Sequence, residues 1–517
     1  MQVSPTLGDT SNSAVETDLL PALIDYVAVH EARQRFSIES RVARQIQANL
    51  RVPSSPRTVA FISRAPEFLP IEFIIVGGGV GGLTASIALS RLGHRVTVLD
   101  ENNDWDQTQG AGGCRLAPNV TKIYYRWGME EKLKKIGVVS QYIQFADYET
   151  GRLGANGEWV EDFQIESGGE FLSLHYADFR KLLYDTCVEL GVKVRGGAKV
   201  TQYHVRPERP SVTLASGEEV HGDVLIAADG RMSLSRQLML GDRNYEKLQN
   251  VMVFNAVVPM TKMAEDPDLD GFLHEKQEGT VFSWFGEDRG ALGFPTAAQG
   301  RNEFCLHTFA PSDWGEPDTM LEVGRAELVK SVQNAEPRLR KLAELASTVI
   351  AIPVVERPHI DEWLHPDGSL LVIGEAAHPL TTGSLYAITL AVEDAMMLGR
   401  LFHHLHRRDQ IGNFLTALAE KRQARVRTVE ITQRVNPLSI ALPPGVDQAR
   451  YLKAAVENMT AADAVSLTQD AIRVLFAYDP EDEADDWWVQ WGLLQERHAR
   501  LLPLSPGISV DVEKKNS

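Results

Sequence analysis

The apolar positions between residues 71 and 100 predict a strand, a helix and a second strand. Residues 73–76, Phe-Ile-Ile-Val, form a short apolar run with β-branched members, which is typical of a strand buried on both faces. Apolar residues then recur at helical spacing over residues 83–92, and residues 96–99 form a second apolar run. Five glycines within residues 77–82 break this stretch, so it indicates a strand, a turn and a helix and not a membrane span.

Later parts of the chain show further patterns. Residues 224–227 and 370–373 are short apolar runs that predict two more buried strands, and residues 389–406 have the apolar spacing of a helix. Between residues 250 and 355, short β-prone runs alternate with turn residues, which predicts an antiparallel sheet outside the first unit. From residue 410 onward the chain is mostly helix-prone.

Composition and charge exclude several classes of partner and site. The 517 residues include 52 basic and 70 acidic side chains, and the formal charge of −18 repels a phosphate backbone, which argues against nucleic-acid binding. The acidic run at residues 479–486 is expected to be a solvated loop. Three cysteines lie far apart, so neither a disulfide framework nor a metal site is expected. The first thirty residues contain acids and no apolar run, so we expect a cytoplasmic protein without a secretory signal or membrane span.

A glycine-rich turn joins the first predicted strand to the predicted helix. Its pattern is Gly77-x-Gly79-x-x-Gly82. The first glycine permits the tight turn, the second lets the backbone approach a pyrophosphate, and the third lets helix and strand pack closely. Asp100 follows the next strand, where a carboxylate accepts hydrogen bonds from a ribose hydroxyl. The combination predicts a dinucleotide site without distinguishing FAD from NAD.

Two later strands also end in short motifs. In residues 222–236 a buried strand ends at Asp229-Gly230, and a serine and an arginine follow at short distances. Taken alone, this segment is equally well explained as a strand that ends in a turn, because Asp-Gly is a common turn pair. Residues 374–379 read Gly-Glu-Ala-Ala-His-Pro after the last buried strand, and Glu-Asp-Ala follows at residues 393–395.

Together these motifs resemble those of the single-component aromatic-ring hydroxylases, the FAD-dependent monooxygenases of the para-hydroxybenzoate and salicylate hydroxylase type. The Asp-Gly pair resembles the Asp-Gly motif of that family, and residues 374–379 resemble its second FAD motif, which is usually Gly-Asp-Ala-Ala-His-Pro. Residues 111–119, which contain Gly113 and Arg115, resemble the family's loop along the flavin. The motifs follow the family order over residues 71–400, and the tryptophan-rich tail resembles fungal members.

The resemblance implies an α/β protein with a Rossmann-like FAD-binding fold. It further implies an inserted mixed or antiparallel sheet that forms the substrate domain, and a helical C-terminal region. The expected boundaries are 1–70 for a partly helical N-terminal extension, 71–250 for the first part of the FAD-binding domain with some substrate-domain strands, 251–360 for the substrate-binding sheet domain, 361–410 for the second part of the FAD-binding domain and 411–517 for the helical C-terminal region.

The same resemblance implies a redox reaction on a small aromatic or otherwise electron-rich molecule, as in secondary metabolism. NADPH or NADH would reduce FAD, and O2 would supply one oxygen atom to the substrate and the other to water. The protein's part is to position the substrate and to exclude water. The sequence identifies neither a catalytic base nor an oligomeric state, and we interpret His378 as part of a turn motif. The residues expected to bind the cofactor are Gly77, Gly79, Gly82, Asp100, Gly113, Arg115, Tyr176, Asp229, Gly230, Glu375 and Ile388.

Several positions depart from the family pattern and bear on the mechanism. Glu375 stands where the family has Asp, and Tyr176 stands where it commonly has Arg. Residues 384–388, Ser-Leu-Tyr-Ala-Ile, replace a glycine-rich stretch that lets backbone N–H groups approach the flavin. Many fungal relatives carry an Arg near Asn255 and a Tyr near Phe294, so the loss of both predicts a less acidic or more apolar substrate.

Three functions are compatible with these residues. The first is an NAD(P)H-dependent monooxygenase. The second is a flavoenzyme of the same fold that oxidises or dehydrogenates its substrate without inserting oxygen. The third is a redox-inactive relative that acts as a binding protein or a cyclase, which the departures at Tyr176, Glu375 and residues 384–388 keep open.

Overall fold

The computed structural model describes most of the chain after residue 68. The N-terminal extension expected at residues 1–70 therefore lies outside the described residues, apart from its last two positions. Much of the helical region expected at residues 411–517 also lies outside them. The described residues are 69–105, 112–158, 168–274, 279–286, 289–298, 301–316, 320–380, 384–435 and 474–494.

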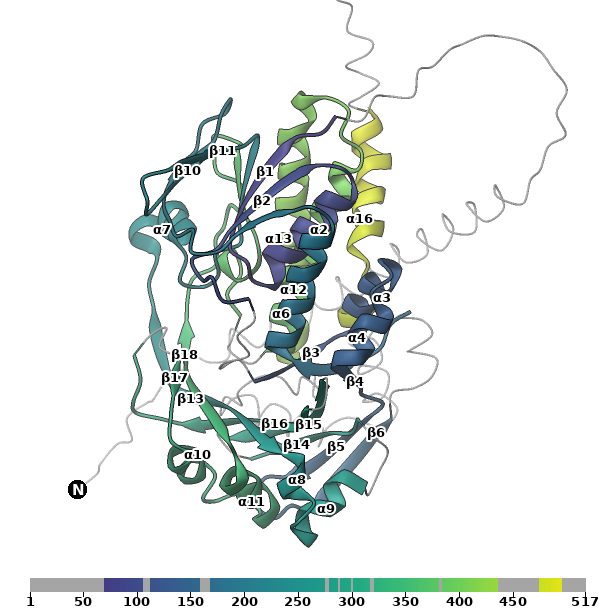
Figure 1. Ribbon diagram of the computed structural model, residues 1–517, viewed down its shortest axis with the longest axis vertical. Helices are drawn as coiled ribbons and strands as arrows, with labels where there is room; N and C mark the ends of the chain where they lie inside the picture. Colours follow the sequence, from purple (N-terminus) through teal and green to yellow (C-terminus); the bar gives the residue numbers. More distant parts are fainter. Residues whose placement is uncertain are drawn as a thin grey trace, which may run out of the picture. The chain divides into compact units, whose positions relative to one another are not determined.

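A five-stranded parallel sheet contains the strands expected near the dinucleotide motifs (Figure 1). In spatial order its strands are β19 (Leu370–Val372), β12 (Val224–Ala227), β1 (Glu72–Val76), β2 (Arg95–Leu99) and β8 (Lys193–Arg195). Every neighbouring pair is parallel, and β1 lies beside β12 although the two are far apart in the chain. The side chains of β12 are buried throughout, as the apolar run predicted. The three strand ends that carry the sequence motifs therefore lie at one edge of the sheet.

Three helices pack around this sheet: α2 (Val80–Arg91), α6 (Tyr176–Glu189) and α12 (Leu385–Phe402). Helices α2 and α12 approach each other closely, because small residues face one another. A Cβ on Gly399 would lie 2.7 Å from the Cβ of Ala88. Helices α2 and α12 are thereby held together near Ala88 and Gly399.

Helix α12 begins earlier than the apolar spacing predicted. Ser384 accepts a hydrogen bond from the backbone N–H of Tyr386 and so caps the helix, which starts at residue 385 and not near residue 389. The following helix, α13 (Ile411–Val435), packs along α12. The first turn of α12 is therefore part of the region that replaces the family's glycine-rich stretch.

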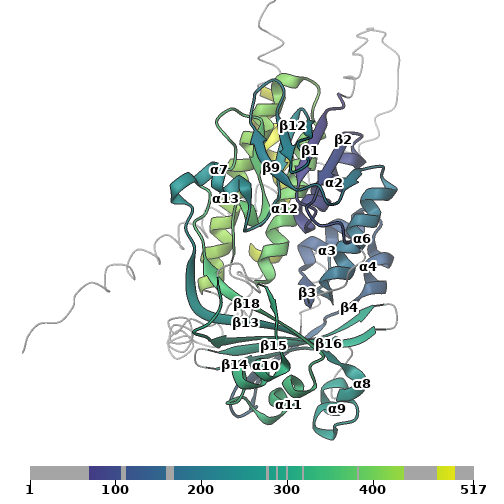
Figure 2. The ribbon, with the colours of Figure 1, turned by 60° about the vertical axis from the view of Figure 1, so that its left-hand side comes forward.

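An eight-stranded sheet forms a second layer of the described fold (Figure 2). All neighbouring strands are antiparallel except one parallel pair, which joins residues 142–147 to residues 281–285. The expected mixed or antiparallel sheet is therefore confirmed. In spatial order the strands are β17 (Leu321–Glu322), β18 (Thr348–Glu356), β13 (Lys247–Pro259), β16 (Arg301–Pro311), β15 (Gly290–Ala298), β14 (Val281–Phe285), β5 (Tyr142–Asp147) and β6 (Leu153–Glu158).

The two faces of this sheet have different neighbours (Figures 1 and 2). Along β13, Phe254 and its alternate neighbours join an apolar core with four short helices on one face. Asn255 points to the opposite face, because successive side chains of a strand alternate. That face meets strand β3 (Gly113–Leu116), since a Cβ on Gly113 would lie 2.6 Å from both the Sγ of Cys305 and the ring of Phe294. The four helices are α8 (Met260–Met263), α9 (Pro267–His274), α10 (Arg325–Ser331) and α11 (Pro337–Leu345).

Strand β3 belongs to a small sheet that contacts both α12 and the eight-stranded sheet. Its middle strand, β7 (Leu172–His175), leads directly into α6. The small sheet thus connects the dinucleotide unit with the second layer. The remaining elements used below are β4 (Gly137–Val139), α3 (Pro118–Arg126), α4 (Glu130–Ile136), β9 (Val200–His204), β10 (Ser211–Leu214), β11 (Glu219–His221) and α7 (Leu234–Leu240).

The acidic run near the C-terminus is a helix, and the prediction of a solvated loop was wrong. It forms α16 (Pro480–Trp487), which packs against α12. Asp479 caps this helix, and the acids of its first turn favour the positive end of the helix dipole. Basic partners offset the charge: the Asp479 carboxylate lies 3.0 Å from the Nζ of Lys122, and Arg400 donates a hydrogen bond to Asp485 at 2.7 Å. These partners are distant in sequence, so the local charge pattern could not reveal them.

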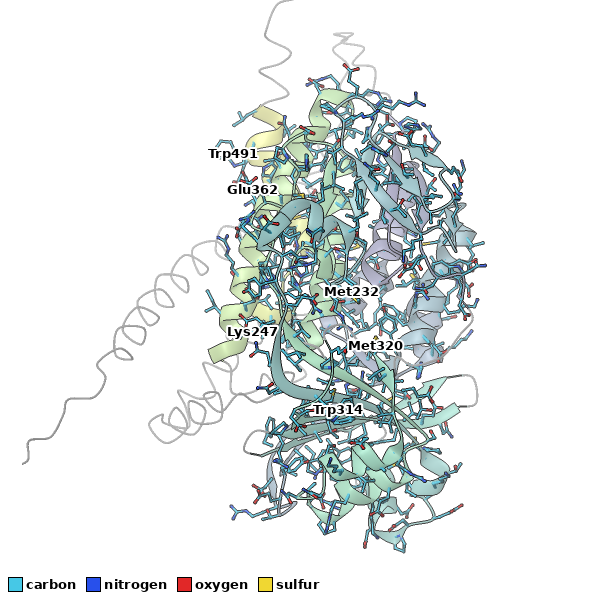
Figure 3. All side chains as sticks on the ribbon, turned by 90° about the vertical axis from the view of Figure 1, so that its left-hand side faces the viewer. Met232, Lys247, Trp314, Met320, Glu362 and Trp491 are labelled. Carbon is cyan, nitrogen blue, oxygen red and sulfur yellow. The ribbon has the colours of Figure 1, made fainter. Side chains whose placement is uncertain are left out.

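Among the described residues, no helix is long and apolar enough to cross a membrane. Large apolar side chains reach the surface at a few positions, including Met232, Met320 and Trp491 (Figure 3). In that view Trp491 lies away from Met232 and Met320. Single exposed apolar residues of this kind are ordinary on protein surfaces.

Candidate functional site

The glycine turn between β1 and α2 has a shape that only glycine allows. Gly77 has a φ angle of +108°, and a Cβ there would lie 2.1 Å from the carbonyl oxygen of Ala228. A Cβ on Gly82 would lie 2.0 Å from the carbonyl oxygen of Gly77. Gly79 differs, because a Cβ there would meet nothing within 4 Å. It precedes α2 without a side-chain cap, so the free N–H groups of the first turn lie beside open space that fits a phosphate group.

Asp100 supports this turn from the end of β2. Its carboxylate accepts hydrogen bonds from the backbone N–H of Gly78 at 2.6 Å and from that of Asn102 at 2.8 Å. Each carboxylate oxygen accepts more than one hydrogen bond, so capacity for a ribose hydroxyl is left. Asp100 therefore lies where the motif predicted, and it has a second role in fixing the turn.

Helix α6 brings a cation to the same turn. The Nε of Arg180 donates a hydrogen bond to the carbonyl oxygen of Gly78 at 2.9 Å, and its Nη2 lies 3.7 Å from Asp100. The guanidinium also stacks over the ring of Trp105 at 4.4 Å. Tyr176 lies four residues earlier on the same face of α6. Arg180 therefore brings a positive charge to the glycine turn, from the helix on which this chain has Tyr176 where the resembled family commonly has Arg.

In the Asp-Gly pair after β12, the aspartate carboxylate accepts hydrogen bonds from other side chains of the protein. Asp229 accepts hydrogen bonds from the hydroxyl of Ser235 at 2.6 Å and from the phenol of Tyr203 at 2.9 Å. Burial raises the pKa of the Asp229 carboxyl group. Gly230 has a φ angle of +78°, and a Cβ there would meet nothing within 4 Å. Of the pair, Gly230 is therefore the residue with open space beside it.

The motif after β19 is held by a buried carboxylate. Asp394 accepts hydrogen bonds from the backbone N–H of Gly374 at 2.9 Å and pairs with the Nε2 of His378 at 2.7 Å. His378 is 1% exposed, in agreement with its interpretation as part of a turn motif. Arg236 donates a hydrogen bond to the carbonyl oxygen of Ala376 at 2.7 Å. This bond joins the segment that follows the Asp-Gly pair to the second motif.

Glu375 is the second residue of the motif after β19 and lies in a short helical turn, Gly374–Ala376. Its side chain is partly exposed and has no hydrogen-bond partner among the described residues. Its charge acts on the phenol of Tyr176, which is partly buried. Burial, opposed by Arg180 and assisted by Glu375, raises the pKa of Tyr176 to about 12, so this phenol is neutral at pH 7.

The sheet face that meets β3 is apolar and carries a few polar groups. Asn255 on β13 lies directly opposite His307 on β16, and the rings of Phe294 and His307 are 5.3 Å apart. Among the described residues, the Oδ1 of Asn255 and the Nε2 of His307 are buried without a hydrogen-bond partner. Burial lowers the pKa of His307 to about 4, so its imidazole is neutral at pH 7. The apolar part of this face consists of Ile143, Val281, Leu292, Phe294 and Cys305.

The chain matches a known protein family over most of its length. The FAD binding domain family matches residues 71–432 of the chain. The chain belongs to this family. The relatives with assigned names include FAD-dependent monooxygenase OpS4 of Beauveria bassiana (strain ARSEF 2860), which is 26% identical over 373 residues that cover 71% of this chain and 85% of the relative.

Two further comparisons agree with this assignment. 3-Hydroxybenzoate 6-hydroxylase 1 of Aquipseudomonas alcaligenes is 27% identical over 328 residues, covering 63% of this chain and 79% of the relative. The crystal structure of CtdE in complex with FAD and a substrate has a TM-score of 0.67 at 18% identity, covering 82% of this chain and 100% of CtdE, and so shares its fold. The protein is an FAD-dependent oxidoreductase of the monooxygenase type, as the motifs predicted.

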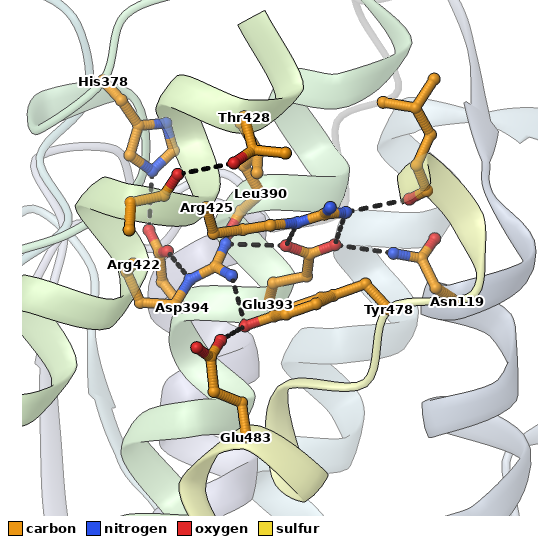
Figure 4. A network of polar contacts seen from close by, with 12 residues as sticks. Asn119, His378, Leu390, Glu393, Asp394, Arg422, Arg425, Thr428, Tyr478 and Glu483 are labelled. Atoms are coloured by element: carbon orange, nitrogen blue, oxygen red, sulfur yellow. Dashed lines mark hydrogen bonds and ion pairs between the residues drawn. The ribbon is translucent and has the colours of Figure 1, made fainter. Parts of the chain in front are cut away.

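A buried network of charged side chains stands behind the second motif of this flavoprotein (Figure 4). Glu393 on α12 pairs with Arg422 and Arg425 on α13, and Asp394 pairs with Arg422. These four side chains are at most 5% exposed. Asn119 on α3 donates a further hydrogen bond to Glu393 at 2.7 Å. Since Asp394 also holds the loop of the second motif, the network connects three helices to that loop.

The residues expected to bind FAD lie in two regions of the structure. The region at the edge of the parallel sheet includes open space at the glycine turn and an unpartnered carboxylate, and these features fit a pyrophosphate and sugar hydroxyls. Sequence reasoning missed Arg180, whose spacing from Tyr176 was a visible signal, and His307, for which no local signal exists. Gly77, Gly79, Gly82, Asp100, Tyr176, Asp229, Gly230 and Glu375 lie in the first region, and Gly113, Arg115 and Ile388 lie on β3 and α12.

Proposed function

We propose that this flavoprotein hydroxylates a small aromatic molecule and uses NADPH or NADH together with O2. The observation that carries the proposal is the apolar sheet face, with its neutral Asn255 and His307, placed against β3, which in turn contacts α12. An aromatic ring is suited to such a wall, since a flat apolar surface buries it and a few polar groups orient it. The named relative that acts on 3-hydroxybenzoate supports an aromatic substrate.

The overall reaction balances without any further reactant. An aromatic C–H bond, O2, NAD(P)H and a proton give an aromatic C–OH bond, NAD(P)+ and water. Bound FAD would supply the redox chemistry, by accepting electrons from the nicotinamide and activating O2. The chain itself has to bind FAD, orient the substrate and keep water out.

Three residues of the first region have assigned tasks in this proposal. The turn at Gly79 and the N–H groups at the start of α2 would hold the pyrophosphate of FAD. Asp100 would accept hydrogen bonds from the adenosine ribose, and Glu375 from the ribityl chain. The longer side chain of Glu375 compared with Asp is compatible with that task, because it ends in the same two acceptors.

The start of α12 and the sheet face complete the site. The positive end of α12 favours negative charge on the flavin ring, and Ile388 and β3 would line that ring. The five apolar residues of the sheet face would exclude water from the reacting atoms. We infer that the chain works in the cytoplasm, with its FAD-binding part formed by residues 71–250 and 361–410 and its substrate sheet by residues 251–360.

A substitution at Gly79 tests the function without disturbing the fold. A valine side chain there meets no protein atom in the direction of its Cβ, but it would fill the space assigned to the pyrophosphate. We expect Gly79→Val to fold normally, to purify without flavin and to lose NADPH-dependent hydroxylation. Gly324→Val is the matched control, because Gly324 also precedes a helix, α10, with nothing within 4 Å of its Cβ direction.

The readouts are the visible spectrum, the thermal unfolding temperature and the mass of the product formed from a panel of phenols and aromatic acids. A yellow wild-type protein that consumes NADPH faster with an aromatic compound, and releases a product heavier by one oxygen atom, supports the proposal. A wild-type protein that binds no added FAD contradicts it. So does a flavoprotein that converts O2 only to H2O2 with every compound of the panel.

A further inference from the structure

Arg115 carries a positive charge where the described part of the chain gives it no partner. Its side chain extends from β3, and the residue is 8% exposed. The Nε and Nη2 atoms are buried and have no hydrogen-bond partner among the described residues. Burial lowers the pKa of Arg115 to about 10, so the guanidinium is still charged at pH 7. A buried cation without an anion is strongly unfavourable, which points to a ligand.

The other buried arginines of the described chain all have acceptors. Arg422 and Arg425 pair with the carboxylates of α12, and Arg236 donates to a backbone carbonyl. Arg357 donates to Glu246 at 3.2 Å. Each of these four arginines therefore donates to at least one acceptor, although the Nε of Arg236 has none, and Arg115 is the exception in the described ranges.

The surroundings of Arg115 are aromatic. Its guanidinium carbon lies 5.6 Å from the ring centre of Phe171, whose ring is 5.1 Å from that of Phe476. Phe476 in turn stacks on Tyr386 at 5.8 Å, in the first turn of α12. Burial raises the pKa of Tyr386 and lowers that of His307, and the positive charge of Arg115 acts on both groups. The guanidinium is therefore close to the sheet face assigned to the substrate.

We propose that Arg115 binds an ionised oxygen, a carboxylate or a phenolate, on the aromatic ring of the substrate. The inference rests on the proposed function, because it assigns a group to the molecule that this function hydroxylates. Asn255 and His307 on the opposite wall are neutral, so the substrate's charge is placed at β3. This differs from the expectation of a less acidic substrate, which considered the sheet positions at Asn255 and Phe294 alone.

The test compares acids with their neutral amides. Calorimetric titration of the FAD-loaded protein, without NADPH, uses benzoate and salicylate against benzamide and salicylamide. Hydrogen bonds to a charged group favour the acid by roughly tenfold or more in affinity. We expect this preference in the wild-type protein, its loss in Arg115→Gln and its partial retention in Arg115→Lys, which keeps the charge but not the planar donor pair.

Unfolding of the ligand-free protein gives an independent readout. Arg115→Gln removes a buried charge that has no partner, so we expect a higher unfolding temperature. Arg425→Gln is the matched control, because it leaves Glu393 with one cation fewer and is expected to lower the unfolding temperature. A purely structural role of Arg115 would give both variants the same sign.

Two results would overturn the inference. The first is a wild-type protein that binds no acid more tightly than its amide. The second is an Arg115→Gln variant that keeps the preference; if this variant also loses FAD affinity and shifts the flavin spectrum without any ligand, the cation serves the flavin instead. Flavin content and hydroxylation are measured on the same samples, so a flavin-loaded, active enzyme without acid preference contradicts this inference alone.

Discussion

A buried imidazole with one unpaired ring nitrogen makes the stability of this protein depend on pH. Burial lowers the pKa of His307 from 6.5 to about 4. Between these values the unfolded chain binds the proton and the folded chain does not, so the free energy of unfolding falls as the pH drops from 6.5 to 4. The full effect of one such group is roughly 3 kcal/mol. His94, whose pKa burial also lowers to about 4, acts in the same direction.

We expect His307→Gln to lose less stability than the wild type over this pH range. Denaturant unfolding at several pH values between 4 and 7 measures it. The explanation fails if the slope is the same in His307→Gln as in the wild type.

Local constraints could be read from the sequence, whereas constraints set by distant residues could not. Gly77 and Gly82 are required by backbone contacts within their own turn and with the adjacent strand end, so their spacing alone identified them. The partners of Asp229 and Asp394 lie in other elements, and their hydrogen bonds appeared only in the fold. Arg115 was expected to bind the flavin, but its lack of an acceptor depends on the tertiary structure.

At the scale of an element, helix α6 carries a positive charge, Arg180, one turn after Tyr176. Arg180 contacts the glycine turn, and Tyr176 occupies the neighbouring position on the same face. We expect Arg180→Ala to weaken FAD binding roughly tenfold, since a charged hydrogen bond beside the pyrophosphate site is lost. Adding Tyr176→Arg to this variant should restore part of the affinity. Quenching of FAD fluorescence on adding apoprotein measures both.

Lys181→Ala is the control for this experiment. Lys181 is the next residue of α6 and pairs with Asp185 at the surface. Its removal lowers the positive charge of the helix by the same amount but leaves the glycine turn untouched. Equal losses of FAD affinity in Arg180→Ala and Lys181→Ala would show that the contact of Arg180 with Gly78 is unimportant.

The network between α12 and α13 stabilises the second flavin motif from behind. Asp394 accepts from Arg422 and also holds Gly374 and His378 (Figure 4). We expect Asp394→Asn to lower the free energy of unfolding by about 3–5 kcal/mol, because an amide cannot accept from all these donors and leaves a buried arginine with less charge compensation. Denaturant unfolding of the apoprotein measures the change.

An exposed ion pair provides the comparison for that variant. Glu130 lies 2.9 Å from Lys134 on α4, and both side chains are well exposed. Glu130→Gln should therefore cost less than about 1 kcal/mol. Similar losses in the two variants would mean that burial of the network around Asp394 contributes nothing special to stability.

At the scale of the whole described fold, the sequence predicted the class of fold and missed part of its layout. The strands at residues 73–76 and 224–227 were found almost to the residue, because buried parallel strands are continuous apolar runs. Most of the mixed sheet was expected from residues 250–355, and some of its strands were expected within residues 71–250 without being located; β5 and β6 come from residues 142–158. That pairing depends on chain topology, which short-range alternation of apolar residues does not contain.

The strand order also has a consequence for how the protein is made on the ribosome. Strand β12 pairs with β19, and helix α2 packs against α12. Both partners are synthesised much later than β12 and α2. The segments proposed to bind FAD therefore cannot come together until translation has passed residue 402, where α12 ends. Until then the nascent chain exposes an unpaired strand and an apolar helix face, which favours slow folding and a need for chaperones during synthesis.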